Sequence, residues 1–387
     1  MADSVRLGII GLGVQGGTYA KFLAEGRVSG MTLGAIADID PQKKQDAEEF
    51  GVPFFSGYQE LLDSGSVDAI ITTVPHYLHA EIAMAALSRD IHALVEKPAG
   101  VYVRQVQELI EFAAVRPKLS FGIMFNQRTN PLYVRLKEII DAGEIGDILR
   151  TNWIITTWWR PQAYYDQSEW RATWGGEGGG VLVNQAPHQL DLWQWLCGIP
   201  QTVFAKAAFG YRRDIAVEDE VTALVDYGNG ATGVLVTATH DLVGTDRLEI
   251  LGTAGKIVVD KSKTATVTRL AKPEIEISRE LDMQAVGKIM REAGDDGNEL
   301  FTTETLEFDT KWGGQHISVL ENFAANILDG TPLLAPGADG INGVRLANAI
   351  HLSSWTGREV PLHFDDEEYL AELNKRIRDE GKFPERS

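Results

Sequence analysis

Lys97 is the residue whose type and setting best suit proton transfer. It follows an apolar run, Ile91–Val95, that predicts a buried strand, and it stands between Glu96 and Pro98. In open parallel sheets, ligands bind just beyond the carboxyl ends of the strands. A lysine placed there is partly removed from water, which favours the neutral amine and lets it act as a base. A surface Glu–Lys pair at a strand end explains these residues, taken alone, equally well.

His188 is a second group able to move protons, and it lies in a glycine-rich segment far along the chain. Three glycines, 178–180, allow the backbone to approach a ligand closely, and Pro187 suits the first turn of a helix. At a helix N-terminus the dipole disfavours the imidazolium, so His188 would be a neutral acceptor. The alternative is a capping histidine without chemistry.

The N-terminal segment carries a dinucleotide-binding pattern. The apolar run Val5–Ile10 predicts a buried parallel strand, and it leads into Gly11, Gly13 and Gly16 and then a helical stretch. Glycines at this spacing allow a tight turn, a close approach to a pyrophosphate and close helix–strand packing. The helix N-terminus supplies N–H groups for the phosphates. With a strand before it and a helix after it, the pattern is strong.

Asp38 favours NAD over NADP as the cofactor. It ends a second predicted strand, Met31–Ala37, about twenty positions after the glycines, where the acid that binds the ribose belongs. A carboxylate there accepts hydrogen bonds from the ribose hydroxyls and repels a 2′-phosphate. The next residues supply no arginine to offset that repulsion, although Lys43 and Lys44 follow closely.

Strands and helices alternate through residue 126, which predicts a doubly wound parallel sheet of the Rossmann type over residues 1–126. The segment Thr73-Val74-Pro75-His76 follows another strand and should line the same crevice. His76 and His79 have the spacing of half a metal site. No acidic or cysteine partner completes it, so a loop over the cofactor is the better interpretation. The predicted helices are 42–50, 59–62, 79–87 and 103–114, and the remaining strands are 69–73 and 119–124.

Beyond residue 126 the pattern changes to successive strands without helices between most of them. This indicates an α+β domain over residues 127–387 with a mostly antiparallel sheet, and its apolar strands suggest an open face for a partner subunit. Residues 271–310 have no clear period, and we expect an insertion that covers the pocket. Helices are expected from Pro131 to Gly143, over 318–328 and over 342–355, and strands over 148–157, 203–209, 220–227, 232–239, 247–251 and 256–259.

Aromatic and arginine side chains crowd the segment from Trp158 to Trp174. Aromatic faces pack against the C–H-rich faces of sugars, and arginine can bind hydroxyl groups through two donors. The tryptophans could instead fill a core beneath a long loop.

Composition narrows the function further. A formal net charge of −19 argues against nucleic acid or an anionic membrane as a partner. The single cysteine, Cys197, excludes an internal disulfide framework and suits a reducing cytoplasm. We expect neither a signal peptide nor a membrane span.

These motifs together resemble the Gfo/Idh/MocA family of sugar and cyclitol oxidoreductases. The matching segments are Gly11–Gly16, Asp38, Thr73–His76, Glu96-Lys97-Pro98, Phe125–Arg128 and Gly178–His188. The resemblance implies that Lys97 and His188 form the catalytic pair and that NAD⁺ accepts a hydride from a secondary alcohol. One departure is Asn184, since the family usually has aspartate there. An amide can orient a hydroxyl but cannot relay a proton.

The narrower likeness is to family members that oxidise the C3 hydroxyl of glycosides. Alternatives are an inositol-type cyclitol dehydrogenase, an NAD-dependent glycosidase that oxidises C3 transiently, and a sugar or redox sensor without catalysis. The partners expected are a small carbohydrate and further copies of the chain. The expected substrate-binding residues are Asn184, Gln185, Arg128, Trp158 and Tyr164. The expected cofactor-binding residues are Gly11, Gly13, Val14, Gln15, Gly16, Asp38, Thr73, Val74, Pro75, His76, His79, Glu96, Lys97, Asn126, Trp170 and Arg171.

Overall fold

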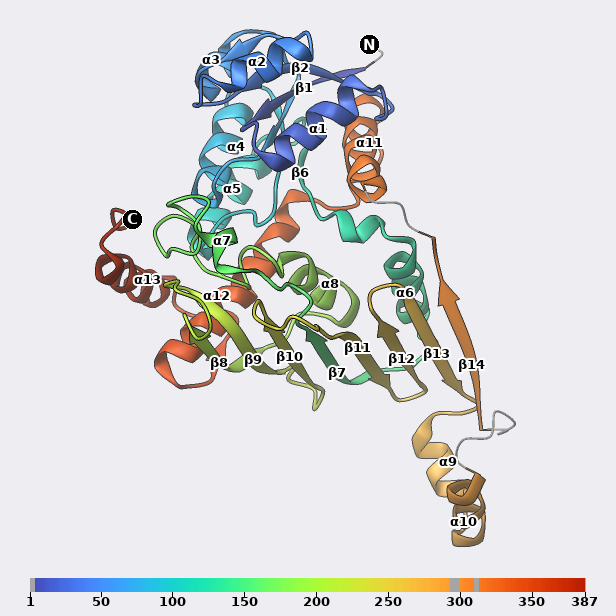
Figure 1. The fold of residues 1–387 in the computed structure, drawn as a ribbon. Coiled ribbons are helices and arrows are strands. Elements are labelled where there is room, and N and C mark those ends of the chain that lie inside the picture. The colour runs from blue at the N-terminus through green and yellow to red at the C-terminus, as the bar shows by residue number, and fades with distance from the viewer. Residues whose placement is uncertain (1–3, 293–299, 310–312, 387) are drawn as a thin grey trace.

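The computed structural model describes residues 4–292, 300–309 and 313–386, and two β-sheets organise them (Figure 1). The first sheet has the order β3-β2-β1-β4-β5-β6, and every neighbouring pair is parallel. This confirms the predicted Rossmann sheet. Its strands are β1 (Val5–Ile10), β2 (Met31–Ala37), β3 (Phe54–Phe55), β4 (Ala69–Thr72), β5 (His92–Val95) and β6 (Phe121–Ile123).

Helices cover both faces of this sheet because its strands are apolar on both sides. Ile70, Ile71 and Leu94, for example, are at most 1% exposed. The helices of this half lie close to their predicted positions. They are α1 (Val14–Ala24), α2 (Lys43–Glu49), α3 (Tyr58–Asp63), α4 (His79–Leu87) and α5 (Val103–Ala114).

The second sheet has the order β14-β13-β12-β11-β7-β10-β9-β8-β15 and is antiparallel except for the parallel pair β7–β10. The mostly antiparallel sheet is therefore confirmed. Its strands are β7 (Ile148–Ile155), β8 (Thr202–Phe209), β9 (Glu218–Asp226), β10 (Thr232–Ala238), β11 (Asp246–Gly252), β12 (Gly255–Asp260), β13 (Thr264–Leu270), β14 (Phe301–Glu307) and β15 (Val360–Pro361).

Among the described residues, helices pack on one face of this second sheet, between it and the first domain (Figure 1). Inward residues such as Trp153 and Leu235 are fully buried there, whereas the outward Ile154, Phe204 and Leu224 are 40–49% exposed. The open face therefore carries an apolar row. The covering helices are α6 (Pro131–Asp141), α8 (Pro187–Cys197) and α12 (Gly340–Thr356), with the short α7 (Gln162–Tyr165) and the C-terminal α13 (Asp366–Glu380) at the same end.

Helix α11 (Gly314–Asp329) returns to the first sheet. Val319, Leu320 and Phe323 are buried in one cluster with Val5 and Leu7 of β1. The chain after residue 127 therefore contributes to both cores, and the division at residue 126 stays a prediction.

The prediction that residues 271–310 cover the pocket is wrong. The described part of this stretch forms α9 (Glu274–Glu280), α10 (Met283–Glu292) and β14, and the two helices lie beyond the far end of the second sheet (Figure 1). The reason is that β13 and β14 pair as a hairpin along the sheet edge, which carries their connection away from the first domain. No helix among the described residues is long and apolar enough to cross a bilayer.

Candidate active site

A cavity of about 570 Å³ lies at the carboxyl ends of β1, β2 and β4. Twelve of the predicted site residues line it: Gly11, Gly13, Val14, Gln15, Asp38, Thr73, Val74, Pro75, Tyr164, Trp170, Arg171 and Asn184. The last four come from the second domain. The cavity is therefore closed by both halves of the chain. The prediction missed further lining residues from the sheet ends, the start of α3, and the short helix η1 (His76–Leu78) with α4, namely Ile10, Ala37, Ile39, Gly57, Tyr58, Leu78 and Ile82.

The glycines shape the turn between β1 and α1. Gly11 has φ +95°, and a Cβ there would lie 2.6 Å from the Thr73 carbonyl oxygen. A Cβ on Gly16 would overlap the Gly11 carbonyl, whereas one on Gly13 would meet nothing within 4 Å. Gly11 and Gly16 thus serve chain packing, and Gly13 leaves open space where a pyrophosphate can approach the backbone.

Polar groups of the cavity fit a dinucleotide. Asp38 accepts hydrogen bonds from the Leu12 N–H (2.6 Å) and the Asp40 N–H (2.8 Å), which fixes its carboxylate at the cavity wall. The side chain of Gln15 lines the cavity and interacts with the hydroxyl of Tyr19 in α1. Lys43, which could have favoured a 2′-phosphate, is paired with Asp46 at 3.1 Å. The site therefore fits NAD.

Lys97 reaches across from β5 to the glycine-rich segment of the second domain. Its Nζ donates a hydrogen bond to the Asn184 carbonyl oxygen at 2.9 Å. Burial lowers the pKa of Lys97, although the carboxylates of Glu96 and Glu177 act in the opposite direction. The net effect lowers the pKa of Lys97, which is the direction that general-base chemistry requires.

Glu96 is turned away from the Lys97 amine. Its Oε1 accepts a hydrogen bond from the hydroxyl of Tyr19 in α1, and its Oε2 accepts one from the Lys97 backbone N–H at 3.0 Å. Burial raises the pKa of this carboxyl group. Glu96 is 8% exposed and does not line the cavity, so its role is to hold the backbone of Lys97 in place.

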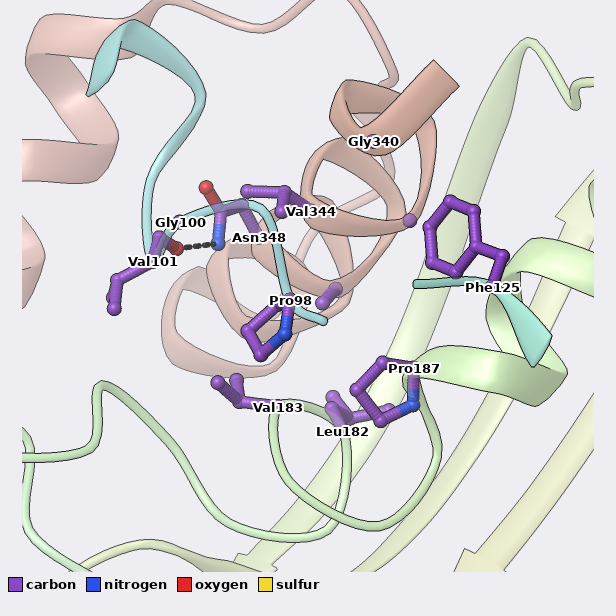
Figure 2. A pocket seen from close by; sticks show the side chains of 12 residues that line it. Pro98, Gly100, Val101, Phe125, Leu182, Val183, Pro187, Gly340, Val344 and Asn348 are labelled. Atoms are coloured by element: carbon purple, nitrogen blue, oxygen red, sulfur yellow. Dashed lines mark hydrogen bonds between the residues drawn. The ribbon is translucent and has the colours of Figure 1, made fainter. Parts of the chain in front are cut away.

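His188 approaches Lys97 from the second domain. Pro98, next to Lys97, and Pro187, next to His188, line one apolar cavity beside α12 (Figure 2). Burial lowers the pKa of His188 well below its usual value, and the nearby Lys97 charge lowers it further. Its Nδ1 is buried without a partner among the described residues. An amine and a neutral imidazole, distant in the chain, are thus neighbours.

Comparison with known proteins decides the family. Residues 5–122 match the model of the oxidoreductase family with an NAD-binding Rossmann fold, and residues 133–258 match the GFO/IDH/MocA C-terminal domain. The chain belongs to the Gfo/Idh/MocA oxidoreductase family. It is an enzyme of the sugar and cyclitol dehydrogenase type, and its cofactor is NAD.

Relatives within the family match half of the chain or more. Myo-inositol 2-dehydrogenase of Thermotoga maritima is 26% identical over 92% of this chain and 98% of its own. Inositol 2-dehydrogenase of Salmonella typhimurium is 31% identical over 50% of this chain and 54% of its own. The structure of levoglucosan dehydrogenase with NADH and levoglucosan has a TM-score of 0.77 and 21% identity, covering 93% of this chain and all of that one. This last similarity shows a common fold.

Arg128 does not present a free guanidinium to a substrate. It is 5% exposed and donates to Asp191 at 2.9 and 2.6 Å and to Asp339 at 2.6 Å. Burial raises the pKa of Asp191 to about 6, against the pull of Arg128. The expectation that Arg128 binds substrate is therefore corrected. It joins α8 to the segment before α12.

His79 is likewise buried away from the cofactor cavity. Its Nδ1 lies 2.7 Å from the Pro98 carbonyl oxygen, and its Nε2 lies 2.8 Å from that of Val74. These contacts hold the Lys97-Pro98 turn against the loop after β4. The prediction that His79 contacts the cofactor is therefore corrected. His76 is also buried, with Nδ1 3.0 Å from the Glu177 carbonyl oxygen.

The other expected residues lie around these groups. Asn126, in the short helix η2 (Asn126–Thr129), and Trp158 each have a buried polar atom without a partner among the described residues. Gln185 is 7% exposed and adjoins Asn184. None of the three lines the cofactor cavity, and their roles stay predictions.

Two residues near Lys97 were not among the predicted site residues. His316, at the start of α11, lies 3.0 Å from Asn126 Nδ2 through its Nε2, and burial with the Lys97 charge lowers its pKa to about 4. The second is Glu177, which is 2% exposed. Neither has a local sequence signal. His316 stands alone in a helical segment, and Glu177 is one acid among glycines.

Proposed function

We propose that this protein oxidises a secondary hydroxyl of a sugar, anhydrosugar or cyclitol, with the C3 hydroxyl of a pyranose such as levoglucosan as the first candidate. The observation that carries the proposal is the partly buried Lys97 amine, which is lowered in pKa, bonded to the carbonyl of the cavity-lining Asn184 and close to a neutral His188. The levoglucosan dehydrogenase fold and the inositol dehydrogenase relatives support the substrate class.

Lys97 is the base in this proposal. An ordinary lysine has a pKa of about 10.4, and a base working at neutral pH needs about 7–8. Burial moves Lys97 in that direction, and its bond to the Asn184 carbonyl holds the amine in place. Lys97 accepts the hydroxyl proton, and the neutral His188 offers an acceptor for the same or an adjacent hydroxyl. NAD⁺, when bound, supplies the hydride acceptor.

Aromatic and cationic side chains supply the sugar-binding wall. Tyr164 lies close to two guanidinium groups, with the Arg160 Cζ 5.1 Å and the Arg171 Cζ 4.8 Å from its ring centroid. Arg171 also stacks on Trp170 at 4.7 Å. An apolar face with donors at its rim suits a ring that is C–H-rich on one side and carries hydroxyls at its edge.

Lys97→Met tests the proposal. Wild-type protein is screened for NADH formation with levoglucosan, inositols, free aldoses and glycosides. With the best substrate, Lys97→Met should lower kcat by about 10²–10⁴-fold, because the base is lost. NADH affinity should change little. Lys118→Met, at an exposed position, is the control. Unchanged turnover in Lys97→Met would refute Lys97 as the base.

Inositol oxidation is the second candidate, favoured by the inositol 2-dehydrogenase relatives. The same screen separates the candidates, because a cyclitol enzyme prefers inositols to pyranoses. A glycosidase working through transient oxidation would release the aglycone without net NADH.

Two further proposals concern the protein's setting. The apolar row of Ile154, Phe204 and Leu224 on the open sheet face supports a homo-oligomer, which light scattering measures. We also place the protein in the cytoplasm, since its single cysteine, Cys197, is a buried free thiol.

A further inference from the structure

Glu177 is a buried acid in the glycine-rich segment. Its Oε2 accepts a hydrogen bond from the Ala172 N–H at 2.6 Å, and its Oε1 accepts one from the side-chain Nδ2 of Asn184. Arg171 Nη1 lies 3.7 Å from the same Oε1. The carboxylate therefore ties together two parts of the loop that forms the second-domain wall of the cavity.

Asn184 connects Glu177 to the catalytic base. The Asn184 backbone carbonyl accepts the hydrogen bond from Lys97 Nζ, while its side-chain amide is held by Glu177. An ionised carboxylate only accepts hydrogen bonds, so it selects the NH₂ end of the amide. Asn184 lines the cavity, and its Oδ1 is then left as an acceptor for a donor group of a ligand.

The Glu177 backbone reaches the cofactor side of the site. Its carbonyl oxygen lies 3.0 Å from Nδ1 of His76, which follows the cavity-lining Thr73-Val74-Pro75 segment. Glu177 thus links three segments: the loop after β4, the aromatic and arginine-rich loop from Trp158 to Trp174, and the segment around Asn184, whose carbonyl binds Lys97.

The charge of Glu177 also acts on Lys97. Burial raises the pKa of Glu177 to about 7, so a substantial share is ionised at and above neutral pH. In that form it raises the pKa of Lys97, partly offsetting the lowering by burial. The other charged or titratable groups coupled to Lys97 are Glu96, Arg160, Arg171, His76, His79, His188 and His316, and Glu177 itself also interacts with Glu218.

We propose that Glu177 is a positioning residue for the oxidation, which fixes the Asn184 amide so that its Oδ1 binds a substrate hydroxyl and its carbonyl holds Lys97. The inference rests on the proposed function. It also assigns a substrate requirement: a hydroxyl donor for Asn184 besides the hydroxyl that gives its proton to Lys97. A vicinal diol on a sugar or cyclitol ring supplies both.

A reciprocal exchange provides the sharpest test. In Glu177→Gln the new amide can accept from the Ala172 N–H, but its NH₂ then faces the Asn184 NH₂. In Glu177→Gln with Asn184→Asp, the same NH₂ donates to the new carboxylate. The hydrogen bond and the negative charge are both restored, with their polarity reversed.

The readout is kcat against pH and kcat/KM against pH. We expect Glu177→Gln to lower the kcat plateau about 10–100-fold. The acid limb of kcat/KM should move to lower pH by roughly one unit, because losing the negative charge lowers the pKa of Lys97. The double variant should have a kcat at least tenfold higher than that of Glu177→Gln, and its acid limb should return towards the wild-type pH. Glu169→Gln, an exposed acid in the same loop, should leave both unchanged.

Two results would overturn the inference. One is a Glu177→Gln variant whose kcat plateau is within twofold of wild type and whose acid limb lies within about 0.2 pH unit of wild type. The other is a folded double variant no more active than Glu177→Gln. If the double variant does not fold, Asn184→Ala replaces it. That variant should lose kcat, and a retained kcat would count against the inference.

A readout without substrate keeps this test separate from the proposed function. Modification of Lys97 by fluorodinitrobenzene, mapped by mass spectrometry across pH, follows the pKa of its amine. Glu177→Gln should move the midpoint to lower pH. If no polyol is oxidised by wild type but the midpoint moves, the proposed function fails and the coupling stands. An unmoved midpoint overturns the coupling, whatever the substrate.

Discussion

Gly343→Ala should stabilise the protein without harming catalysis. Gly343 is buried in the interior of α12, where alanine is favoured over glycine by about 1 kcal/mol. A Cβ built at this position lies 4.0 Å from both the Leu190 Cβ and the Pro187 carbonyl oxygen, which is ordinary contact distance. Burying one methyl group adds about 0.8 kcal/mol. The free energy of unfolding should therefore rise by about 1–2 kcal/mol.

Gly340→Ala, one turn earlier in the same helix, is the matched control. Its Cβ would lie 2.7 Å from the Ala99 Cβ and 2.8 Å from Ile123 Cδ1, so something must move. Overpacking of this kind costs about 1–3 kcal/mol. Ala99 follows the Lys97-Pro98 turn, and Gly340 and Pro98 line the same small cavity (Figure 2). The strain should therefore also lower kcat.

Thermal unfolding and steady-state kinetics check the pair. We expect Gly343→Ala to raise Tm by about 2–6 °C with kcat within twofold of wild type, and Gly340→Ala to lower both Tm and kcat. The same Tm change in both variants would refute the argument, because helix propensity alone would then decide the outcome. A large loss of kcat in Gly343→Ala would show that the cavity wall must stay open for turnover.

Two further variants test the cofactor site and the interior. Asp38→Ser should raise the KM for NAD by about tenfold and improve the use of NADP relative to NAD, because the ribose loses its acceptor and the 2′-phosphate its repulsion. Equal coenzyme kinetics in the variant and the wild type would contradict that role. Arg128→Met should lower the free energy of unfolding in urea by about 3–5 kcal/mol, because the charge of Asp191, 2% exposed, is left unpaired. A loss below about 1 kcal/mol would mean that Asp191 takes up a proton at little cost.

The first domain was predictable because its signals are local. Apolar runs specify the strands, and the turn at Gly11 needs a positive φ that glycine adopts readily. Asp38 follows from its distance to that turn. Each of these features is written within about forty residues, and the structure places them where the spacing predicts.

The second domain was less predictable because the two strands at one edge of its sheet, β13 and β14, are rich in polar residues. β13 and β14 each contain three threonines and no continuous apolar run, so apolar runs do not identify them as strands. Without that hairpin, residues 271–310 looked like an insertion over the pocket. The pairing of β13 with β14, across about forty residues, decides where this segment lies.

Arg128 shows a second limit of reasoning from sequence. A motif arginine after β6 is as compatible with substrate binding as with a buried ion pair. Its partners are 63 and 211 residues away, in α8 and in the short helix η3 (Gly337–Asp339). Only the packing of α8 and the pre-α12 segment around it shows that its donors are already used. His316 was not predicted as a site residue for the same reason, since its neighbours come from α1, η2 and the Lys97 turn.

Asn184 brings these two limits together at the site itself. From sequence, an amide there looked like the loss of a proton-carrying acid, leaving Lys97 and His188 to work alone. The structure shows a carboxylate seven residues earlier, Glu177, bonded to that amide. A negative charge near Lys97 is thus present, but Glu177 carries it, and Asn184 lies between Glu177 and the cavity. Such an arrangement supplies electrostatic balance to Lys97 while leaving at Asn184 a group that cannot take the substrate's proton, so the proton must pass to the amine or the imidazole.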